Sequence, residues 1–470
     1  MFKRTKIIAT LGPASESREV IYGLIEEGVN LFRFNLKHNE RSWHKDKINL
    51  VREIAEDLNK KVGVVLDLQG PDIRIGNVSN GKVELISEKE IYFESKITGE
   101  DSIELAPNIL RVLDVGQEVV IDDGNHRLEV IEKISPTKVK AQVIQGKTLT
   151  PKKSIFFPDL ELDIPALSKK DEEDVKLASE VNAEYLALSF VRNRNDIVLL
   201  RKLVSKLRGK SKIIAKIETL KAVKNINEIL EEADAIMVAR GDLGVEINLE
   251  AVPSVQKKLI NMSIKQGKPV IVATQILKSM VENPIPTRAE ICDIANASYE
   301  LTDAVMLSEE SAVGKYPEKV VHFMSRTLRY NEMTNVSVDT VTLHAKSQIE
   351  AIVLAANNLQ KYLKEGNNNP VAFIVLTESG KTATLFSATR PELPILAFTQ
   401  SEYVARSLSL SWGVESFTFT FETTVDGSVK EIVNHLVKSR IIKKGDSVIV
   451  VSGQNIGVAG QTDSLRIITV

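Results

Sequence analysis

Cysteine is almost absent from this chain, since Cys292 is the only one among 470 residues. A single cysteine excludes an internal disulfide and fits a reducing compartment. No stretch of about 18 apolar residues occurs, so no membrane-spanning helix is expected. The apolar run near the N-terminus is cut by Gly12 and Pro13, which makes it too short for a signal peptide. Together these absences predict a cytoplasmic protein.

The chain also lacks an excess of either charge. It has 61 Lys and Arg against 63 Asp and Glu, which gives a net charge of −2. Such a balance provides no broad basic surface, so neither nucleic acid nor a membrane is an expected partner. What the chain does have is length and 43% hydrophobic residues. These values predict a globular protein with roughly two to four domains.

Short apolar runs alternate with amphipathic stretches through most of the chain. This alternation is typical of strand-helix units built around a parallel sheet. Eight such units predict an α/β protein with a (β/α)₈ TIM barrel, whose reacting groups sit at the C-terminal ends of the strands. The eight predicted strands are 6–10, 30–35, 62–67, 185–189, 213–218, 235–240, 269–274 and 304–308.

Segment 71–158 departs from this pattern. Its helical period disappears, and alternating runs are separated by turn sequences such as Asp122-Asp123-Gly124-Asn125. We predict an all-β insert after the third barrel strand, placed over the barrel mouth as a lid that excludes water. The barrel then comprises residues 1–70 and 159–334. Residues 335–470 form a C-terminal α/β domain, with a predicted helix at 347–365 and predicted strands at 371–376, 394–398, 416–421, 447–451 and 465–470.

Charged residues gather at the ends of the predicted strands. Lys216 and Glu218 close the fifth strand, and Asp242 follows the sixth. Two carboxylates with a lysine between them suit a divalent cation and an anionic substrate, because oxygen ligands hold Mg²⁺ and an ammonium group neutralises a phosphoryl group. Any one of these residues alone is more simply a solvated strand cap. Six on one rim favour a site for a phosphorylated acid: Arg33, Asp67, Arg74, Lys216, Glu218 and Asp242.

Several specific motifs are distributed along the chain, mostly at the ends of the predicted barrel strands. They are 5–15, Arg33-x-Asn35-x-x-His38, Gly70-Pro71-Asp72-Ile73-Arg74, Lys216-Ile217-Glu218, 237–244, 273–280, 286–290 and 306–312. In these motifs the chain resembles the pyruvate kinase family over nearly its full length. The resemblance implies a glycolytic reaction that depends on Mg²⁺ or Mn²⁺. In it, phosphoenolpyruvate passes its phosphoryl group to ADP, and the enol is then protonated to pyruvate.

The resemblance also implies roles for the charged residues at the strand ends. Glu218 and Asp242 are expected to hold the divalent ion. Lys216 is expected to neutralise the equatorial oxygens of the moving phosphoryl group, because such transfer depends on positioning and charge compensation. Arg33 is expected to clamp the phosphate with its planar fork. Arg74, at the lid hinge, is expected to join the site only on closure.

Further implied residues bind the rest of the substrates. The backbone N–H groups of Gly241 and Asp242 are expected to bind the substrate carboxylate. Thr274 is expected beside the enol carbon, where it orients a water because a hydroxyl is a poor acid alone. Ser308 and Glu310 lie behind Thr274 as a proton route. The implied nucleotide-binding residues are Asn35, His38 and Arg74, although His38 also fits a histidine on the rim without a ligand.

Lys37 departs from the family pattern, because it stands where the family has a serine that helps to bind K⁺. The remaining groups of that K⁺ site match Asn35, Asp67 and the carbonyl of Leu68. An ammonium group cannot ligate a cation, so we hypothesise that Lys37 replaces K⁺ with its own charge. A lysine turned to solvent is the alternative. The K⁺-independent members of the family carry lysine at the position of Asp72 instead.

A hydroxyl-rich turn, Thr377-Glu378-Ser379-Gly380-Lys381-Thr382, follows predicted strand 371–376. Its N–H groups suit a phosphate, and the same residues are also ordinary helix caps. In the family this loop holds the phosphate of an allosteric sugar phosphate, which implies effector contacts from Thr377, Ser379, Gly380 and Thr382. Segment 452–460 lacks the Trp and Pro-Gly-Ser-Gly run of a fructose 1,6-bisphosphate site. A monophosphorylated sugar or nucleotide, or no effector, stays open. The family also implies a homotetramer.

Two other functions are alternatives to the predicted phosphoryl transfer. Another Mg²⁺-dependent barrel enzyme that acts on pyruvate or phosphoenolpyruvate, such as an aldolase, would need neither the insert nor the C-terminal domain. A catalytically silent regulatory homologue would need no intact reaction centre, yet Lys216, Glu218, Asp242 and Thr274 are all present.

Overall fold

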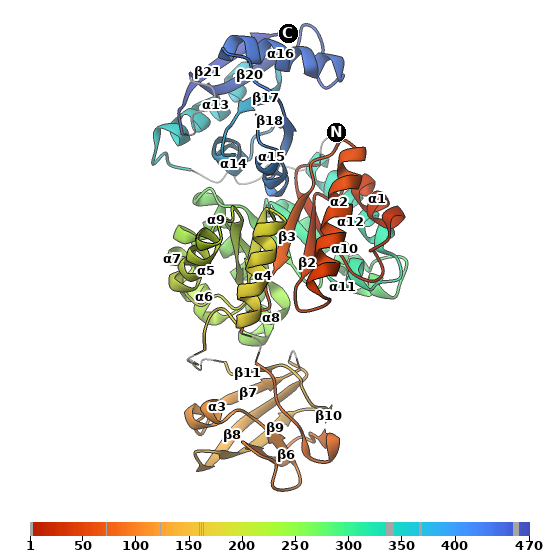
Figure 1. Ribbon diagram of the computed structural model, residues 1–470, viewed down its shortest axis with the longest axis vertical. Helices are drawn as coiled ribbons and strands as arrows, with labels where there is room; N and C mark the ends of the chain where they lie inside the picture. Colours follow the sequence, from red (N-terminus) through yellow and green to blue (C-terminus); the bar gives the residue numbers. More distant parts are fainter. Residues whose placement is uncertain are drawn as a thin grey trace.

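A closed barrel of eight parallel strands forms the centre of the molecule (Figure 1). This computed structural model describes residues 3–71, 73–122, 124–158, 160, 162, 164–334, 343–365, 369–454 and 460–470. Around the barrel the strands follow the order β1-β16-β15-β14-β13-β12-β3-β2. Their bounds are β1 (Lys6–Thr10), β2 (Leu31–Asn35), β3 (Gly63–Asp67), β12 (Tyr185–Leu188), β13 (Lys212–Ile217), β14 (Ala235–Ala239), β15 (Val270–Ala273) and β16 (Ala304–Leu307).

Apolar runs produce these strands, because a parallel strand is covered on both faces. All five residues of β1 are buried, as are all five of β14. Side chains cap the start of α1, α4, α5, α6 and α10, and capping boxes join Ser168 to Asp171 and Thr287 to Glu290. The barrel helices are α1 (Arg18–Glu27), α2 (Arg41–Asp57), α4 (Lys169–Glu180), α5 (Arg194–Lys206), α6 (Leu220–Lys224), α7 (Ile226–Glu232), α8 (Arg240–Glu246), α9 (Val252–Lys265), α10 (Arg288–Tyr299), α11 (Glu309–Ala312) and α12 (Pro317–Thr334), with the 3₁₀ turns η2 (Leu249–Ala251) and η3 (Lys278–Val281).

The predicted fold class is confirmed. Each of the eight predicted barrel strands agrees with the observed strand to within one residue at either end. The insert follows β3, and a separate α/β sheet follows α12. The domain limits at 70/71, 158/159 and 334/335 stay a prediction.

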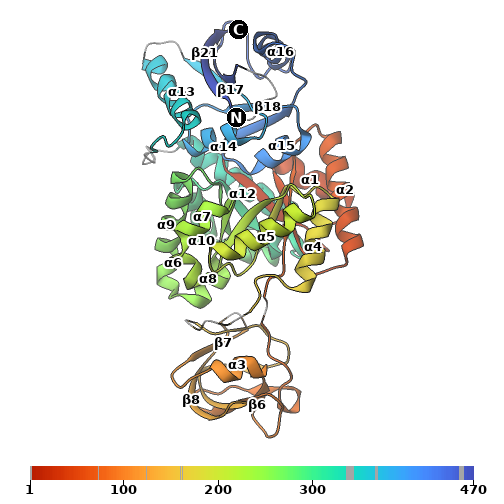
Figure 2. The same cartoon turned by 60° about the vertical axis from the view of Figure 1, so that its left-hand side comes forward.

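The insert is mostly β structure and has its own apolar core (Figure 2). A six-stranded sheet runs in the order β11-β7-β8-β9-β5-β6, and β10 pairs with β4. One short helix, α3 (Pro107–Val112), adds to the expected hairpins. The strands are β4 (Val83–Glu84), β5 (Glu90–Glu94), β6 (Ser102–Glu104), β7 (Glu118–Ile121), β8 (His126–Ser135), β9 (Lys138–Gln145), β10 (Thr148–Leu149) and β11 (Ile155–Phe156), with the turn η1 (Ser79–Gly81) before β4.

The C-terminal part is a five-stranded sheet in the order β19-β18-β17-β20-β21, with only β21 antiparallel. The third strand starts two residues and ends three residues earlier than predicted. The predicted end was too late because Phe419 and Phe421 continue the apolar alternation beyond the strand and pack on the same core. The elements are α13 (Gln348–Glu365), β17 (Pro370–Leu376), α14 (Lys381–Ala388), β18 (Ile395–Thr399), α15 (Glu402–Ser407), η4 (Leu408–Leu410), β19 (Val414–Thr418), α16 (Val425–Lys438), β20 (Ser447–Gly453) and β21 (Thr462–Thr469).

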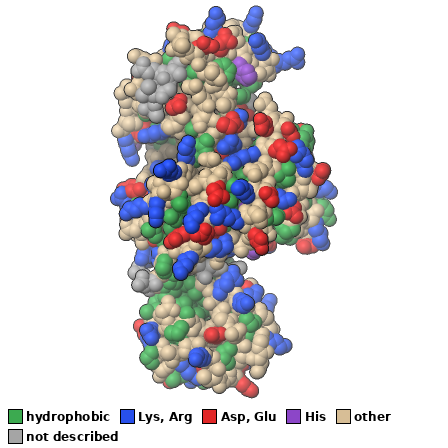
Figure 3. All heavy atoms as spheres, viewed as in Figure 1, with side chains coloured by type: hydrophobic (Ala, Val, Ile, Leu, Met, Phe, Trp, Pro, Cys, Tyr) green, Lys and Arg blue, Asp and Glu red, His purple; other side chains and the backbone are tan. Residues whose placement is uncertain are grey.

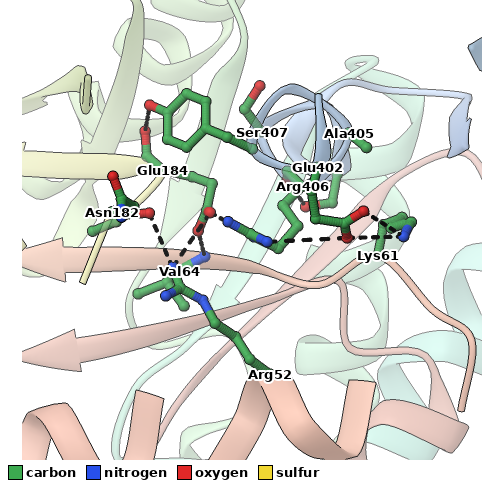
Figure 4. Close-up of polar contacts among 12 residues, drawn as sticks. Arg52, Lys61, Val64, Asn182, Glu184, Glu402, Ala405, Arg406 and Ser407 are labelled. Carbon is green, nitrogen blue, oxygen red and sulfur yellow. Dashed lines mark hydrogen bonds and ion pairs between the residues drawn. The ribbon is translucent and has the colours of Figure 1, made fainter. Parts of the chain in front are cut away.

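The insert and the C-terminal sheet lie at opposite ends of the barrel (Figures 1 and 2). The C-terminal part closes the floor, which is the N-terminal end of the strands. Leu410 of η4 is fully buried in the cluster of side chains that fills the barrel interior. Beside it, Glu184 at the start of β12 accepts a hydrogen bond from Arg406 of α15 at 2.7 Å and one from the backbone N–H of Val64 at 2.9 Å (Figure 4).

Charges on the visible surface are mixed. Basic and acidic side chains are interspersed over the barrel in Figure 3, and hydrophobic side chains gather on the insert where it approaches the barrel. Among the helices of the described ranges, none is both long enough and apolar enough to cross a bilayer.

Candidate active site

The mouth of the barrel, at the C-terminal ends of the strands, faces the insert. The strand register places Asn35 of β2 opposite Asp67 of β3, and Asp67 opposite Ala187 of β12. Since β13 pairs with the other side of β12, Lys216 and Glu218 lie one strand beyond. These charged residues therefore share one rim, although Arg33 and Glu218 are 185 positions apart in the sequence.

Arg33 and Asp67 form a buried pair across β2 and β3. The Asp67 side chain is 2% exposed, and its Oδ2 accepts a hydrogen bond from Nε of Arg33 at 2.7 Å and contacts Nη2 of the same arginine at 2.6 Å. The remaining guanidinium nitrogen donates to the hydroxyl of Thr10 at 3.0 Å. Burial alone would raise the pKa of Asp67, but the charges of Lys216 and Arg33 outweigh it and hold that pKa below its ordinary value.

The Lys216 ammonium lies at the centre of the cluster. Its Nζ is 2.8 Å from Ser189 Oγ, 2.9 Å from Glu218 Oε1 and 3.4 Å from Asp67 Oδ1, and 12% of the side chain is exposed. Burial would lower the pKa of Lys216, but the carboxylates of Asp67 and Glu218 outweigh it and raise that pKa above its ordinary value. The lysine is therefore a permanent cation that is largely shielded from water.

Glu218 is 1% exposed and follows the last residue of β13. Its Oε1 meets Lys216, and its Oε2 accepts the backbone N–H of Phe190 at 2.7 Å. Asp242 lies in the first turn of α8 and is near enough to raise the pKa of Lys216. The described residues contain no group of three or more His, Cys, Asp or Glu able to hold a metal. Glu218 and Asp242 thus offer hard oxygen donors for part of a divalent-ion shell, and water and substrate oxygens complete such a shell in Mg²⁺ sites.

Gly241 and Thr274 are joined directly. The Gly241 N–H donates to the Thr274 hydroxyl at 2.8 Å. Arg240 bridges Asp293, at 2.7 Å, and the carbonyl of Thr274, at 2.8 Å. Thr274 has a φ of 68°, a backbone conformation that costs a β-branched residue about 1–3 kcal/mol and is maintained by such surroundings. A ligand that uses the Gly241 N–H must first displace the Thr274 hydroxyl.

Glu310 organises the loops behind Thr274. It is 1% exposed, and its two oxygens accept the backbone N–H groups of Ser308 at 2.8 Å and Leu277 at 3.2 Å. The expected grouping of Ser308 with Glu310 is therefore present. Both oxygens of Glu310 are engaged by backbone donors in this conformation.

The residues expected to bind the nucleotide lie at the outer edge of the barrel mouth. Asn35 Oδ1 accepts the backbone N–H of Lys37 at 3.2 Å, and the exposed Lys37 places its ammonium 5.9 Å from the centroid of the Phe190 ring. The His38 carbonyl contacts Nε2 of the buried His44 at 2.8 Å. Arg74 donates to the carbonyl of Lys152 within the insert at 2.9 Å. The acid at position 72 lies outside the described residues.

A cavity of about 570 Å³ separates the insert from the loops after β12 and β13. Phe156 of β11 and Phe190 form part of its wall, and their ring centroids are 6.0 Å apart. The insert thus contacts the loop after β12 at Phe190, and the cavity lies beside the charged cluster, since neither Lys216 nor Glu218 lines it.

In the C-terminal part, the hydroxyl-rich turn lies between β17 and α14. Thr377 Oγ1 accepts the Gly380 N–H at 3.0 Å, and Thr382 shares a hydrogen bond with Thr462 of β21 at 2.7 Å. Ser379 lies in the turn between them. Residues 455–459, part of segment 452–460, lie outside the described residues.

Ser189 and Phe190 are two residues of the mouth that the motifs did not single out. Both follow β12, and they contact Lys216 and Glu218 respectively. Their signal was available, because position 189 ends a predicted buried strand with a hydroxyl at the same rim. No site role was predicted for Thr10, although it lies in motif 5–15, or for Asp293, and their partners, Arg33 and Arg240, are distant in sequence.

Comparison with protein families gives two matches that together cover most of the chain. Residues 2–321 match the model described as pyruvate kinase, barrel domain. Residues 345–468 match the model described as pyruvate kinase, alpha/beta domain.

Individual relatives agree. A pyruvate kinase of Sporosarcina psychrophila is 37% identical over 470 residues, which cover 99% of this chain and 80% of that protein. Pyruvate kinase 2 of Synechocystis is 37% identical over 475 residues, with 99% and 79% covered. Among solved structures, a pyruvate kinase from Cryptosporidium parvum superposes with a TM-score of 0.91 at 31% identity, over 99% of this chain and 96% of that one.

Proposed function

This chain belongs to the pyruvate kinase family and is a glycolytic phosphotransferase, and we propose that the buried charges at its barrel mouth carry out the transfer. In the reaction, the bond between phosphorus and the enol oxygen of phosphoenolpyruvate breaks, and a bond to a terminal oxygen of the ADP β-phosphate forms. The enolate left behind then takes a proton on carbon and becomes pyruvate. The observation that carries the proposal is the Lys216 ammonium, held among Ser189, Glu218 and Asp67.

Lys216 compensates the charge of the moving phosphoryl group. It is shielded from water, and an electrostatic interaction in such a site is stronger than in solvent. Its raised pKa keeps it protonated throughout the working pH range. To reach a phosphoryl oxygen, Lys216 gives up one of its present acceptors. Asp67 is the weakest of them, at 3.4 Å, and is already paired with Arg33.

Glu218 and Asp242 hold the divalent ion that the family uses. The donor set fits Mg²⁺ or Mn²⁺, because both residues supply carboxylate oxygens, and Phe190 orients the Glu218 carboxylate. Bound there, the ion supplies positive charge to the substrate's carboxylate and phosphate. Arg33 adds a second fixed cation, since Asp67 and Thr10 hold its guanidinium plane.

The Gly241 and Asp242 N–H groups receive the substrate carboxylate, which displaces the Thr274 hydroxyl from Gly241. Released in this way, Thr274 is free to orient a water beside the enol carbon. Ser308 stands behind it, and Glu310 connects the Ser308 loop to the loop after β15 by accepting the backbone N–H groups of Ser308 and Leu277. Asn35, His38 and Arg74 meet the nucleotide, with Arg74 arriving as the lid closes.

Production of pyruvate tests the assignment. Pyruvate formation from phosphoenolpyruvate and ADP is measured with and without Mg²⁺ in a coupled assay. We expect turnover only with a divalent ion, a large loss in Glu218→Gln, and no loss in Glu250→Gln, an exposed acid beyond the site. Absence of turnover in every divalent ion would contradict the assignment.

We further propose that the enzyme works without K⁺. The support is that the groups matching the family's K⁺ site already have partners in this chain. Asn35 Oδ1 is occupied by the Lys37 N–H, and the Leu68 carbonyl by the Ser189 hydroxyl. Both oxygens of Asp67 face cations. Lys37 itself brings a charge to this side of the mouth.

The K⁺ proposal is tested by replacing potassium with tetramethylammonium. We expect unchanged turnover in the native chain and a new K⁺ requirement in Lys37→Ser. A collapse of native activity that K⁺ restores would contradict it.

We also propose that the turn formed by Thr377, Ser379, Gly380 and Thr382 binds a phosphorylated effector, and that the chain assembles as a homotetramer. Support for the turn is the supply of hydroxyl and N–H groups at the start of α14. The tetramer rests on family membership. Sedimentation with and without a sugar monophosphate tests the assembly, and turnover at low phosphoenolpyruvate tests the effector.

A further inference from the structure

Ser189 is a buried neutral residue inside the charged cluster. It directly follows β12, is 2% exposed, and has its Oγ 2.8 Å from the Lys216 Nζ and 2.9 Å from the Leu68 carbonyl. A hydroxyl has one hydrogen, and an ammonium can only donate. Ser189 therefore accepts from Lys216, and its one hydrogen has the Leu68 carbonyl as its nearer acceptor, with Asp67 Oδ1 farther away at 3.4 Å.

The three acceptors around Lys216 differ in kind. Glu218 and Asp67 are carboxylates, so each partly neutralises the ammonium charge of Lys216. Each also has another partner, since Glu218 is a proposed metal ligand and Asp67 pairs with Arg33. Ser189 is neutral. It can hold one N–H of Lys216 in a fixed direction and leave the positive charge available. When a phosphoryl oxygen replaces one of these acceptors, Ser189 can keep its hydrogen bond to Lys216, because it has no other role in the reaction.

The backbone around Ser189 holds it rigidly. Phe190 has a φ of 54°, unusual for an aromatic residue, and this turn aims its N–H at Glu218. Gly70, the last residue before the insert, packs directly on Ser189, because a Cβ there would lie 2.9 Å from the Ser189 Cβ. Two consecutive residues thus set the positions of Lys216 and Glu218.

We propose that Ser189 is a positioning residue for phosphoryl transfer, whose hydroxyl aims the Lys216 ammonium at the phosphoryl group without neutralising it. This inference rests on the proposed role of Lys216. It predicts that loss of the hydroxyl affects the transfer step and leaves metal binding intact, because Glu218 keeps its bond from the Phe190 N–H.

The first test compares Ser189→Ala with a matched serine. Ser211 is also buried, also donates to a carbonyl, at 2.7 Å, and lies just before β13 at the opposite end of the barrel. We expect Ser189→Ala to lower kcat about 10- to 100-fold, as loss of an orienting partner does, with KM for ADP unchanged. Ser211→Ala should keep its kcat, and Ser189→Cys, which is close in size and a weak acceptor, should recover part of the loss.

Two further measurements separate positioning from a general structural defect. Mn²⁺ affinity, measured by electron paramagnetic resonance, should be the same in Ser189→Ala and the native enzyme. The double variant Ser189→Ala with Lys216→Met should be no slower than Lys216→Met alone, because residues that act through one another are not additive. A kcat of Ser189→Ala within about threefold of native, or an additive double variant, would overturn the proposal. Native activity in Lys216→Met alone would instead overturn the role of Lys216 on which it rests.

Discussion

Buried carboxylates meet basic side chains at both ends of the barrel, at the mouth through Asp67 with Arg33 and at the floor through Glu184 with Arg406. The mouth pair comes from neighbouring barrel strands. The floor pair joins a barrel strand to a helix of the C-terminal sheet domain. At both ends the carboxylate is at most 2% exposed.

The floor carboxylates are saturated by protein donors. Asp303 pairs with Arg390 at 2.6 Å and also accepts the backbone N–H groups of Trp412 and Val270, both at 3.0 Å. Glu184 is held by Arg406, Val64 and, at 3.5 Å, Arg52 (Figure 4). Such pairs connect two domains and leave nothing for a ligand.

The balance of charge differs as well. At the floor, burial raises the pKa of Glu184 although Arg406 and Arg52 act against it. At the mouth, two cations outweigh burial and lower the pKa of Asp67. The exposure of the cations does not separate the two ends, since Arg33 and Lys216 are 12% exposed and Arg406 is 17% exposed; what differs is that the cations outweigh burial at Asp67 and do not at Glu184. Burial and pairing alone therefore do not identify a reaction centre, since structural ion pairs perturb pKa values too.

The largest expected effect is on kcat, when the central cation of the mouth is removed. Lys216→Met should lower kcat by about 10³-fold or more, as removal of a charge-compensating group does in phosphoryl transfer. The melting temperature should fall too, because Glu218 and Asp67 lose a buried partner, so kcat is taken per folded molecule. Steady-state rates and a thermal melt measure both. A variant that melts far below native but keeps its kcat would reverse the contrast.

At the floor, the expected effect is on stability. Arg406→Met removes the main partner of Glu184, and a broken buried pair costs about 3–5 kcal/mol. We expect a clear fall in melting temperature with kcat nearly unchanged. Arg466→Met is the control, because it removes an exposed ion pair to Asp426 that is worth under about 1 kcal/mol. Equal melting temperatures in the two variants would show that the floor pair is not a structural link.

Leu410→Ala tests the apolar part of the floor. Leu410 is fully buried in the barrel interior, and truncation of such a leucine costs about 3 kcal/mol through lost contacts and a residual cavity. Thermal melting should report this loss, while kcat per folded molecule stays native. If kcat instead falls with stability unchanged, the floor is coupled to the mouth rather than separate from it.

The smallest expected effect is a pH dependence near the mouth. Burial lowers the pKa of His44, with Lys170 acting in the same direction and Asp174 in the opposite one. A lowered folded-state pKa means that this contribution to stability is complete above about pH 6.5 and is lost as the pH falls. His44→Gln should therefore lose less melting temperature between pH 7.5 and pH 5.5 than the native chain. Parallel pH profiles would contradict this.

Sequence patterns predicted the barrel strands well because a strand buried on both faces must be apolar throughout. They predicted less at the insert, where the helix α3 spans only six residues and its pattern is too short to read. The strand β19 was misplaced because Phe419 and Phe421 extend the alternation past its end. Apolar alternation indicates which residues are buried. It does not mark where backbone pairing stops.

At the mouth, the sequence by itself determined which groups carry charge and that each follows a strand. Parallel strands bring such positions to one rim, so the sequence alone groups Arg33, Lys216 and Glu218 at one site. Tertiary structure alone decided the partners. A hydrogen bond from Lys216 to Ser189, 27 residues away, or from Arg33 to Thr10 depends on ångström distances between neighbouring strands. The floor links likewise depend on how the C-terminal domain docks. Periodicity in a sequence encodes which face of an element is buried, and only packing encodes what it is buried against.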